Sequence, residues 1–248
     1  MERQPLPVLS KAQGRELERL MLRQYHISGP QMLENGGHAA AQLACDLLDG
    51  DIVDRPIVVL GGRGLPGGSA LAAARRLMNW GAWVQVVCAY PAAAYRGAQG
   101  QQLAALQAAG AALAWAEDGW ELPPCDLLID AVLGGAPVSA HGPERGLIEL
   151  ANSNPAPILS LDAPSGVDGE RGRLHTPHVR AAATLALALP KGGLRSEAAA
   201  AACGDLYLAD IGVPPALYAQ MGIDAPPLFG CNSFLPLHVE NGEIWVRE

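Results

Sequence analysis

Positive charge is scarce in this chain. Its 248 residues include 17 lysines and arginines against 25 aspartates and glutamates, and only Lys11 and Lys191 are lysines. A protein that binds nucleic acid or an anionic membrane through charge needs a basic face. Aromatic side chains are also few, with five tryptophans, five tyrosines and two phenylalanines, too few to suggest a platform for stacked bases. We therefore expect neither a nucleic-acid partner nor a membrane partner.

Paired cysteines and long apolar segments are missing too. The five cysteines are an odd number, lie far apart and form no Cys-x-x-Cys pair, which disfavours a disulfide framework and a thiolate zinc site. The amino-terminal segment is charged and lacks the apolar core of a secretion signal. No run of about 18 uncharged apolar residues free of glycine and proline occurs elsewhere. We expect a cytoplasmic protein.

Two amphipathic helices are predicted near the start of the chain. Ser10, a favoured N-cap residue, precedes apolar residues at helical spacing, which predicts a helix over about 11–25. After the breaker Ser28-Gly29, Pro30 stands where a first-turn proline belongs, and the apolar positions that follow predict a second helix to about residue 47.

Short apolar runs alternate with Ala-rich helical stretches in the rest of the chain. The runs begin at residues 57, 83, 127, 158, 184 and 206, and the helical stretches lie at about 70–80, 97–110, 145–152 and 214–221. Continuous apolarity is typical of strands covered on both faces, as in a parallel sheet. No linker or repeat divides the chain. We predict one α/β domain over residues 1–248, a three-layer α/β/α Rossmann-like sandwich with a mostly parallel sheet and a helical amino-terminal arm.

The carboxyl-terminal tail has a different pattern. Asn241-Gly242 lies between two short segments that contain apolar residues, which is a strong signal for a two-residue hairpin. We predict a C-terminal β-hairpin that adds a small antiparallel ribbon.

A glycine-rich loop follows the first predicted strand. In open α/β sheets, ligands bind outside the carboxyl ends of the strands. Gly62-x-Gly64-x-x-Gly67 formally matches the dinucleotide fingerprint, in which glycines let a backbone approach a pyrophosphate. The next strand carries no acidic residue to hold a ribose, which disfavours ordinary NAD binding. The alternative is a tight strand-to-helix turn with Ser69 as the N-cap of the helix.

Two aspartates end later apolar strands. Asp130 precedes a second glycine-rich loop, and Asp162 precedes the turn Pro164-Ser165-Gly166. A carboxylate in this position can bind a cation, hydrogen-bond a sugar or act as a general acid or base, with Ser165 as a hydroxyl partner. It can also cap a local turn. Two such aspartates beside a glycine loop are more specific than either one alone.

Three further features leave two interpretations each. Lys191 follows a predicted strand and is either an anion-binding group or a solvated lysine. His175-x-x-His178 has the spacing of a metal pair but no further ligand nearby, which favours a surface turn. Glu34-Asn35 either reaches a ligand or stabilises a helix N-terminus.

A series of collinear motifs resembles the YjeF amino-terminal domain family, whose best-known members are NAD(P)H-hydrate epimerases. The motifs are QMLENGG, GGRGLPGGSALAAARRL, LLIDAVLGG, LDAPSGVDG, LPKGGL and GDLYLADIGVP. The elements Asp-x-Pro-Ser-Gly and Asp-Ala-x-x-Gly are the specific ones. The match runs from about residue 10 to 215 and leaves about 216–248 as a C-terminal extension.

This resemblance implies a homodimer that interconverts the R and S forms of hydrated NADH and NADPH, with NAD(P)HX as substrate rather than cofactor. The ring hydroxyl would leave as water, and water would return to the other face of a ring cation stabilised by nitrogen. Asp162 would donate and reclaim the proton. A potassium ion is also implied, with Asp130 and Ser165 as oxygen ligands. The implied ligand-binding residues are Gly64, Gly67, Gly68, Ser69, Gly134, Gly135, Asp162 and Lys191.

The first glycine loop departs from the family pattern Gly-x-Gly-Asn-Asn-Gly-Gly-Asp-Gly. Pro66 stands where the family has an asparagine expected to help bind potassium, and it offers only a backbone carbonyl. Ser69 replaces the family aspartate, and Gly135-Ala136 replaces Thr-Gly in the second loop. Two functions stay open: an NAD(P)H-hydrate epimerase or an enzyme acting on a related nucleotide, and a catalytically inactive homodimeric ligand-binding or scaffold protein.

Overall fold

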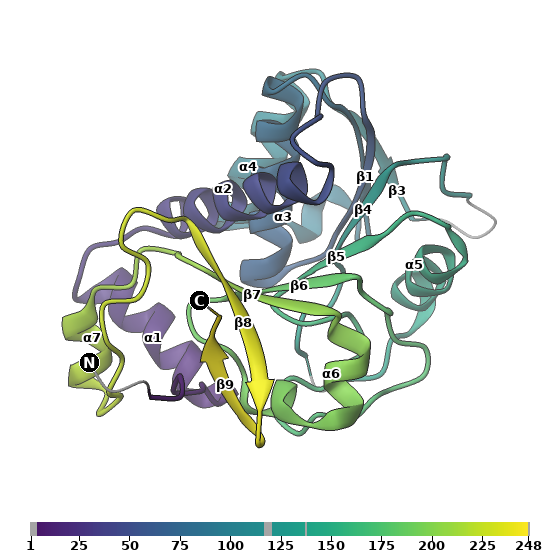
Figure 1. Cartoon of the computed structure of the whole chain (residues 1–248). Helices are drawn as coiled ribbons and strands as arrows, with labels where there is room; N and C mark the ends of the chain where they lie inside the picture. Colours follow the sequence, from purple (N-terminus) through teal and green to yellow (C-terminus); the bar gives the residue numbers. More distant parts are fainter. Residues whose placement is uncertain (1–3, 117–120, 137, 248) are drawn as a thin grey trace.

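A nine-stranded sheet forms the centre of the protein (Figure 1). The structure is a computed structural model and describes residues 4–116, 121–136 and 138–247. The strand order is β3-β2-β1-β4-β5-β6-β7-β8-β9, parallel from β3 to β7 and antiparallel at β8 and β9. The strands are β1 (Pro56–Gly61), β2 (Trp83–Cys88), β3 (Ala112–Trp115), β4 (Leu127–Ala131), β5 (Ile158–Leu161), β6 (Ala183–Leu187), β7 (Asp205–Ala209), β8 (Phe234–Glu240) and β9 (Glu243–Val246).

Helices cover both faces of this sheet, which confirms the three-layer α/β/α prediction (Figure 1). They are α1 (Lys11–Arg23), α2 (Gly29–Leu47), α3 (Gly64–Asn79), α4 (Gly97–Ala108), α5 (Gly142–Ser153), α6 (Glu197–Cys203) and α7 (Pro215–Gln220). Strand β1 shows why the apolar runs are continuous. Ile57 and Val59 belong to the core that includes α2, α3 and α4, whereas Val58 and Leu60 pack in a second core with Leu147 of α5. Both faces of the strand are therefore buried.

The direction of chain growth across the sheet reverses between β1 and β4. From β1 the chain adds β2 and β3 on one side, then returns to place β4 on the other side of β1 and continues to β7. At such a reversal, neighbouring loops diverge at the carboxyl ends of the strands and leave a crevice between them. The fold therefore points to the loops after β1, β4 and β5.

Helix α1 forms as predicted and ends two residues earlier than expected. Ser10 Oγ accepts a hydrogen bond from the Gln13 backbone N–H at 3.2 Å, and Gln13 Oε1 accepts one from the Ser10 N–H at 2.9 Å. This reciprocal arrangement is a capping box. Leu17, Leu20 and Met21 are buried, so one face of the helix is fixed against the core.

The C-terminal hairpin is present, and it does more than form a small separate ribbon. Asn241 and Gly242 have φ values of 52° and 75°, the left-handed pair that a type I′ turn requires. Strand β8 pairs antiparallel with β7, from Leu206 opposite Leu237 to Ala209 opposite Phe234. The hairpin therefore extends the main sheet at its edge.

Three local predictions were wrong or incomplete. Helix α3 begins at Gly64, so Ser69 lies inside the helix and is not its N-cap. Strand β3 was missed because it is a partly exposed edge strand of only four residues, too short to stand out from the alanine-rich helical stretch before it. Helix α6 was missed because its alanine-rich sequence has little apolar periodicity.

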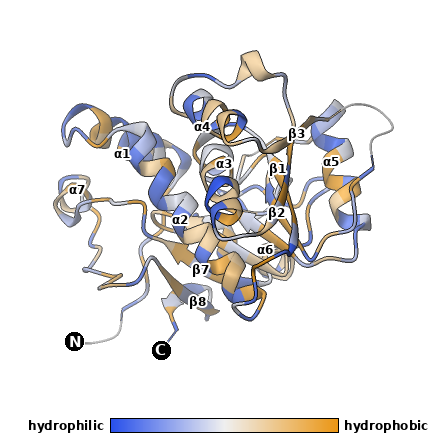
Figure 2. Ribbon diagram, turned by 90° about the horizontal axis from the view of Figure 1, so that it is seen from above, coloured by the Kyte–Doolittle hydropathy of each residue, from blue (hydrophilic) through white to orange (hydrophobic). Residues whose placement is uncertain are grey.

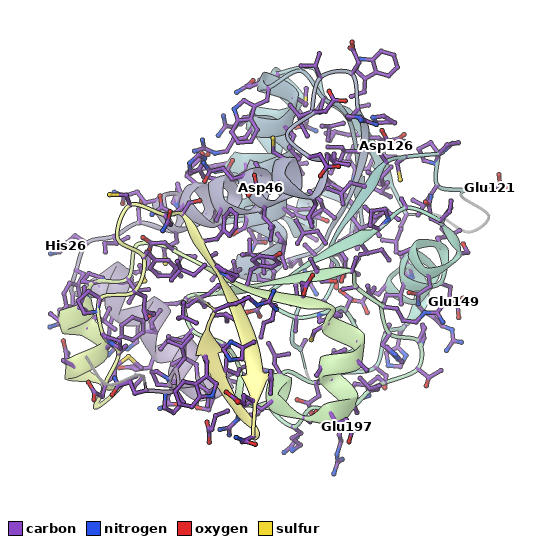
Figure 3. The ribbon with its side chains drawn as sticks, viewed as in Figure 1. His26, Asp46, Glu121, Asp126, Glu149 and Glu197 are labelled. Carbon is purple, nitrogen blue, oxygen red and sulfur yellow. The ribbon has the colours of Figure 1, made fainter. Side chains whose placement is uncertain are left out.

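The hydropathy of the residues differs between the sheet and the outer sides of the helices. Figure 2 shows apolar strands between helices that carry hydrophilic residues on their outer sides. The labelled charged side chains of Glu149 and Glu197 lie at the periphery in Figure 3. Among the described residues, no helix combines the length and the apolar character needed to cross a membrane.

Candidate active site

The two glycine loops pack directly against each other at the point where β1 and β4 diverge. A Cβ atom on Gly62 would lie 2.0 Å from the carbonyl oxygen of Val132, and one on Gly67 would lie 2.2 Å from the carbonyl oxygen of Gly62. Side chains at these positions would collide with backbone. Backbone packing alone therefore explains these two glycines of the fingerprint.

Asp130, at the end of β4, is fully buried and accepts hydrogen bonds at both carboxylate oxygens. Oδ1 accepts from Ser165 Oγ at 2.6 Å and from the Val132 N–H at 3.2 Å. Oδ2 accepts from Ser160 Oγ at 2.8 Å and from the Ser165 N–H at 2.9 Å. Ser165 Oγ in turn accepts from the Leu133 N–H at 2.8 Å. The network ties the loops after β4 and β5 together.

This network does not fit the predicted potassium ligands. An ionised carboxylate has about four lone-pair sites, and four donors already use those of Asp130. Pro66 supplies no side-chain oxygen where the family has an asparagine. Burial raises the pKa of Asp130, and the hydrogen bonds from Ser165 oppose that rise. Asp130 and Ser165 act here as a structural pair.

Asp162 is placed very differently at the end of β5. Its backbone is left-handed, with φ at 72°, a conformation that aspartate tolerates better than most residues and that often marks functional sites. Its N–H donates to the carbonyl of Leu185 in β6 at 2.7 Å, which fixes the turn. Its Oδ1 forms an ion pair with Lys191 Nζ. The loop after β6 thus brings the predicted anion-binding lysine to the predicted catalytic aspartate.

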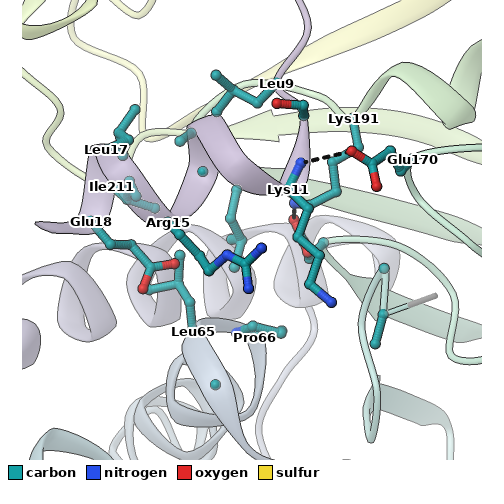
Figure 4. A pocket seen from close by; sticks show the side chains of 18 of the residues that line it. Leu9, Lys11, Arg15, Leu17, Glu18, Leu65, Pro66, Glu170, Lys191 and Ile211 are labelled. Atoms are coloured by element: carbon teal, nitrogen blue, oxygen red, sulfur yellow. Dashed lines mark hydrogen bonds and ion pairs between the residues drawn. The ribbon is translucent and has the colours of Figure 1, made fainter. Parts of the chain in front are cut away.

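A cavity of about 210 Å³ opens beside this ion pair (Figure 4). One wall is α1, the second is the start of α3 in the first glycine loop, and the third is formed by the end of β6 and the loops after β4, β5 and β6. The lining includes Asp162 and Lys191, together with Gly64, Pro66 and Gly135. The crevice expected from the sheet topology is therefore present.

The cavity is rich in cations although the chain is poor in them. Lys11, Arg15, Arg63 and Lys191 line it, so both lysines of the chain are present. The Arg63 guanidinium stacks 4.1 Å above the Tyr90 ring, a cation–π contact that holds it at the rim. Glu18, Asp162 and Glu170 line the same cavity, so its charge is mixed with a small excess of cations. In a chain with a net charge of −8, that local excess is compatible with an anionic ligand.

Comparison with known proteins decides the family. The family model described as YjeF-related protein N-terminus matches residues 29–193. The chain belongs to this family. It is 34% identical over 220 residues to a protein of Dehalogenimonas lykanthroporepellens named NAD(P)H-hydrate epimerase, covering 84% of this chain and 83% of that protein. A protein of the same name from Truepera radiovictrix is 35% identical over 222 residues, covering 87% and 94%.

The fold of this YjeF-related domain is also found in a solved structure. The crystal structure of the yeast protein ynu0 superimposes with a TM-score of 0.78 at 22% sequence identity. The match covers 94% of this chain and 100% of that one. At this identity the likeness shows the fold alone, and it confirms the predicted Rossmann-like architecture.

The structure separates the predicted ligand-binding residues of the family motifs into two groups. Gly64, Gly135, Asp162 and Lys191 line the cavity, and Gly67, Gly68, Ser69 and Gly134 are outside the lining. Ser69 is completely buried where α3 meets α2, and a Cβ on Gly36 would lie 2.6 Å from its Oγ. The side chain that replaces the family aspartate therefore supports helix packing in this arrangement.

The other candidates lie in structural roles. Glu34 binds Arg75 at 2.6 Å and Arg76 at 2.8 Å, which joins α2 to α3. Glu34 is not among the residues that line the cavity, and its partners lie on α3 rather than at the N-terminus of its own helix. His175 contacts Ser139 Oγ through Nδ1 at 3.1 Å. His175 and His178 both lie in a loop, as the surface-turn interpretation expected.

Sequence reasoning missed the contribution of α1 to the site. Lys11, Arg15 and Glu18 all line the cavity. Their spacing of i, i+4 and i+7 places them on one helical face. That signal was present in the sequence, but nothing local to it shows that this face lies against the ends of β5 and β6.

Proposed function

We propose that this protein is an NAD(P)H-hydrate epimerase, interconverting the R and S forms of hydrated NADH and NADPH. The observation that carries the proposal is the position of Asp162, paired with Lys191 and open to a cavity that four cationic side chains also line. Relatives named NAD(P)H-hydrate epimerase, which match most of the chain, support the same activity. The substrate carries a pyrophosphate, and the cations of the cavity suit that charge.

Asp162 serves as the base in this reaction. In its ion pair with Lys191, Asp162 is a carboxylate and can accept a proton from a water molecule that attacks the nicotinamide ring. Lys191 keeps the carboxylate oriented at the mouth of β5. These roles of Asp162 and Lys191 do not involve Asp130 and Ser165, whose oxygen atoms are hydrogen-bonded to one another and to Ser160.

The alternative, an inactive ligand-binding or scaffold protein, rests on the altered glycine loop. The structure offers that interpretation little support, because the loop still forms the first turn of α3 and Leu65 and Pro66 still line the cavity. The named relatives also favour the enzyme.

Potassium binding, a homodimeric assembly and a cytoplasmic location stay predictions. Potassium compared with sodium in the activity assay tests the first, and light scattering coupled to size-exclusion chromatography tests the second. If potassium stimulates turnover, ligands other than the engaged pair of Asp130 and Ser165 are expected to hold it, unless the loops rearrange.

The function is tested by adding purified protein to R-NADHX or R-NADPHX together with an S-specific dehydratase. We expect R substrate to be consumed far above its rate without the protein. Asp162→Asn should lose this activity. Asp126→Asn is its matched control, because Asp126 pairs with Arg55 at the opposite end of the strands. A folded protein that converts neither substrate would contradict the proposal.

A further inference from the structure

A second carboxyl group, Glu18, faces the cavity from α1. Glu18 lines the cavity and is half-buried, and within the described residues it forms no hydrogen bond or ion pair. Glu16, two residues earlier on an outer face of the helix, pairs with Arg19 at 2.7 Å. Burying a carboxyl group without a partner costs free energy. A group kept in this state at a ligand cavity suggests a role toward the ligand.

Glu18 and Asp162 lie in opposite electrostatic settings. Burial raises the pKa of Glu18, and the nearby carboxylate of Asp162 raises it further, while Lys191 partly offsets both effects. Asp162, in contrast, forms an ion pair with Lys191. Two carboxyl groups in one site, one without a partner and with a raised pKa and the other ion-paired, can divide the acid and base roles of an enzyme.

The two groups approach the cavity from different walls. Glu18 extends from α1, and Asp162 with its partner Lys191 comes from the ends of β5 and β6. Figure 4 shows Glu18 and Lys191 on opposite sides of the view, with Arg15 and Lys11 between them. A flat ring lying between these walls would have one carboxyl group toward each face.

Packing at both ends holds α1 in this position. At its start, the N–H of Leu9 donates to the carbonyl of Pro190 at 2.9 Å, directly before Lys191. Farther along, Leu17 and Met21 are buried in the core. Glu18 lies between these anchor points, so its position relative to Asp162 is set by the fold.

We propose that Glu18 is a second catalytic residue and that Glu18 and Asp162 serve opposite faces of the nicotinamide ring. This inference rests on the proposed function. The Glu18 carboxyl donates its proton to the ring hydroxyl on its own face. The C–O bond breaks, the electron pair leaves with oxygen as water, and the ring nitrogen stabilises the cation. A water molecule then adds to the opposite face and gives its proton to Asp162.

The reverse reaction uses the same groups with their roles exchanged. Protonated Asp162 expels the hydroxyl from its face, and the Glu18 carboxylate accepts the proton of the water that adds on the other. One proton is therefore shared between the two groups, and a turnover moves it from one to the other. A single residue that donates and reclaims the proton would have to serve both faces of a ring held in a small cavity.

Oxygen exchange tests this assignment. Purified R and S substrates are incubated separately in ¹⁸O-labelled water with the full-length protein, and both label and stereochemistry are followed. Each group alone can expel and restore the hydroxyl on its own face. We expect Glu18→Gln to lower epimerisation by about 100-fold or more while one epimer still exchanges its hydroxyl. Asp162→Asn should retain exchange only in the other epimer.

Controls separate this result from structural damage. Glu16→Gln, on the same helix and outside the cavity, should epimerise as the wild type does, and Glu18→Asp should recover part of the activity lost in Glu18→Gln. Thermal melting shows whether each variant is folded. Wild-type rates in Glu18→Gln, or loss of exchange in both epimers from a folded Glu18→Gln protein, would overturn the inference. A wild-type protein that neither epimerises nor exchanges oxygen would instead remove the proposed function, and the inference with it.

Discussion

Asp130 and Asp162 lie at the ends of neighbouring strands of one sheet, yet Asp130 has a structural role and Asp162 faces the candidate active site. Asp130 has no exposed surface and accepts four hydrogen bonds. Asp162 pairs with a single lysine and faces a cavity. The sequence pattern around both is alike, an apolar strand followed by a turn. The carboxylate of Asp130 has all its acceptor sites occupied and holds loops together. The carboxylate of Asp162 has unoccupied acceptor sites and is therefore available for chemistry.

The largest effect on activity is expected for Asp162→Asn. The amide cannot accept a proton from water, so we expect turnover to fall by about 10²- to 10⁴-fold. Stability should fall by about 1–3 kcal/mol, less than in Asp130→Ala, because Lys191 loses the charge of a buried partner but keeps some contact with the cavity. Coupled epimerisation kinetics and thermal melting measure both quantities. Full activity in this variant would remove Asp162 from the mechanism.

Asp130→Ala should show the reverse pattern. The buried hydroxyl of Ser160 and the N–H and hydroxyl of Ser165 lose their acceptor, and each unsatisfied buried group costs about 1–3 kcal/mol. We expect the free energy of unfolding to fall by at least about 3 kcal/mol, measured by urea denaturation. A loss below about 1 kcal/mol would show that the network contributes little and would weaken its contrast with Asp162.

The pH dependence of kcat/KM tests whether Glu18 and Asp162 share one proton. The active form carries one shared proton, and burial raises the pKa of Glu18. As pH rises through that raised pKa the proton is lost, so kcat/KM should fall on the alkaline side. The R-to-S and S-to-R profiles should coincide, because the equilibrium between the epimers consumes no proton. In Glu18→Gln this alkaline limb should disappear from the residual activity.

The smallest effect is expected at Glu34, a carboxylate away from the cavity. Burial alone would raise the pKa of Glu34, but hydrogen bonds from Gln102 and Arg75 and the charges of Arg75 and Arg76 outweigh it and lower the pKa. Its stabilising effect is therefore present above the unfolded pKa and lost as pH falls through the lower, folded pKa. Glu34→Gln should cost about 1 kcal/mol or less near neutral pH, and the difference from wild type should shrink in acid, as measured by urea denaturation. Epimerisation should be unchanged.

The sheet and its loops were predictable because their signals are local. Continuous apolar runs marked the strands from β1 to β7 except β3, and Asn241-Gly242 marked the hairpin between β8 and β9. Asp162 and Lys191 stood at strand ends, where an open α/β sheet binds its ligands. What the strand pattern did not show was that β8 would join the main sheet, because that pairing depends on the exposed edge of β7.

The distinction between the two aspartates could not be predicted in the same way. Whether a carboxylate is satisfied depends on donors such as Ser160 and Ser165, which are 30 and 35 residues from Asp130 in the chain. The role of α1 is hidden for the same reason, since Glu18 and Asp162 come to line one cavity only in the folded chain. Ser69 shows the opposite error, because a serine after a glycine loop looks like a cap and is buried within a helix.

The most direct test of the account starts from pure R-NADHX and pure S-NADHX in separate samples and follows both by proton NMR after the wild-type protein is added. We predict that the two samples converge on the same mixture of epimers, much faster than without protein and much faster than with Asp162→Asn. If both samples keep their starting composition while the protein remains folded, the cavity beside Asp162 and Lys191 does not perform this reaction.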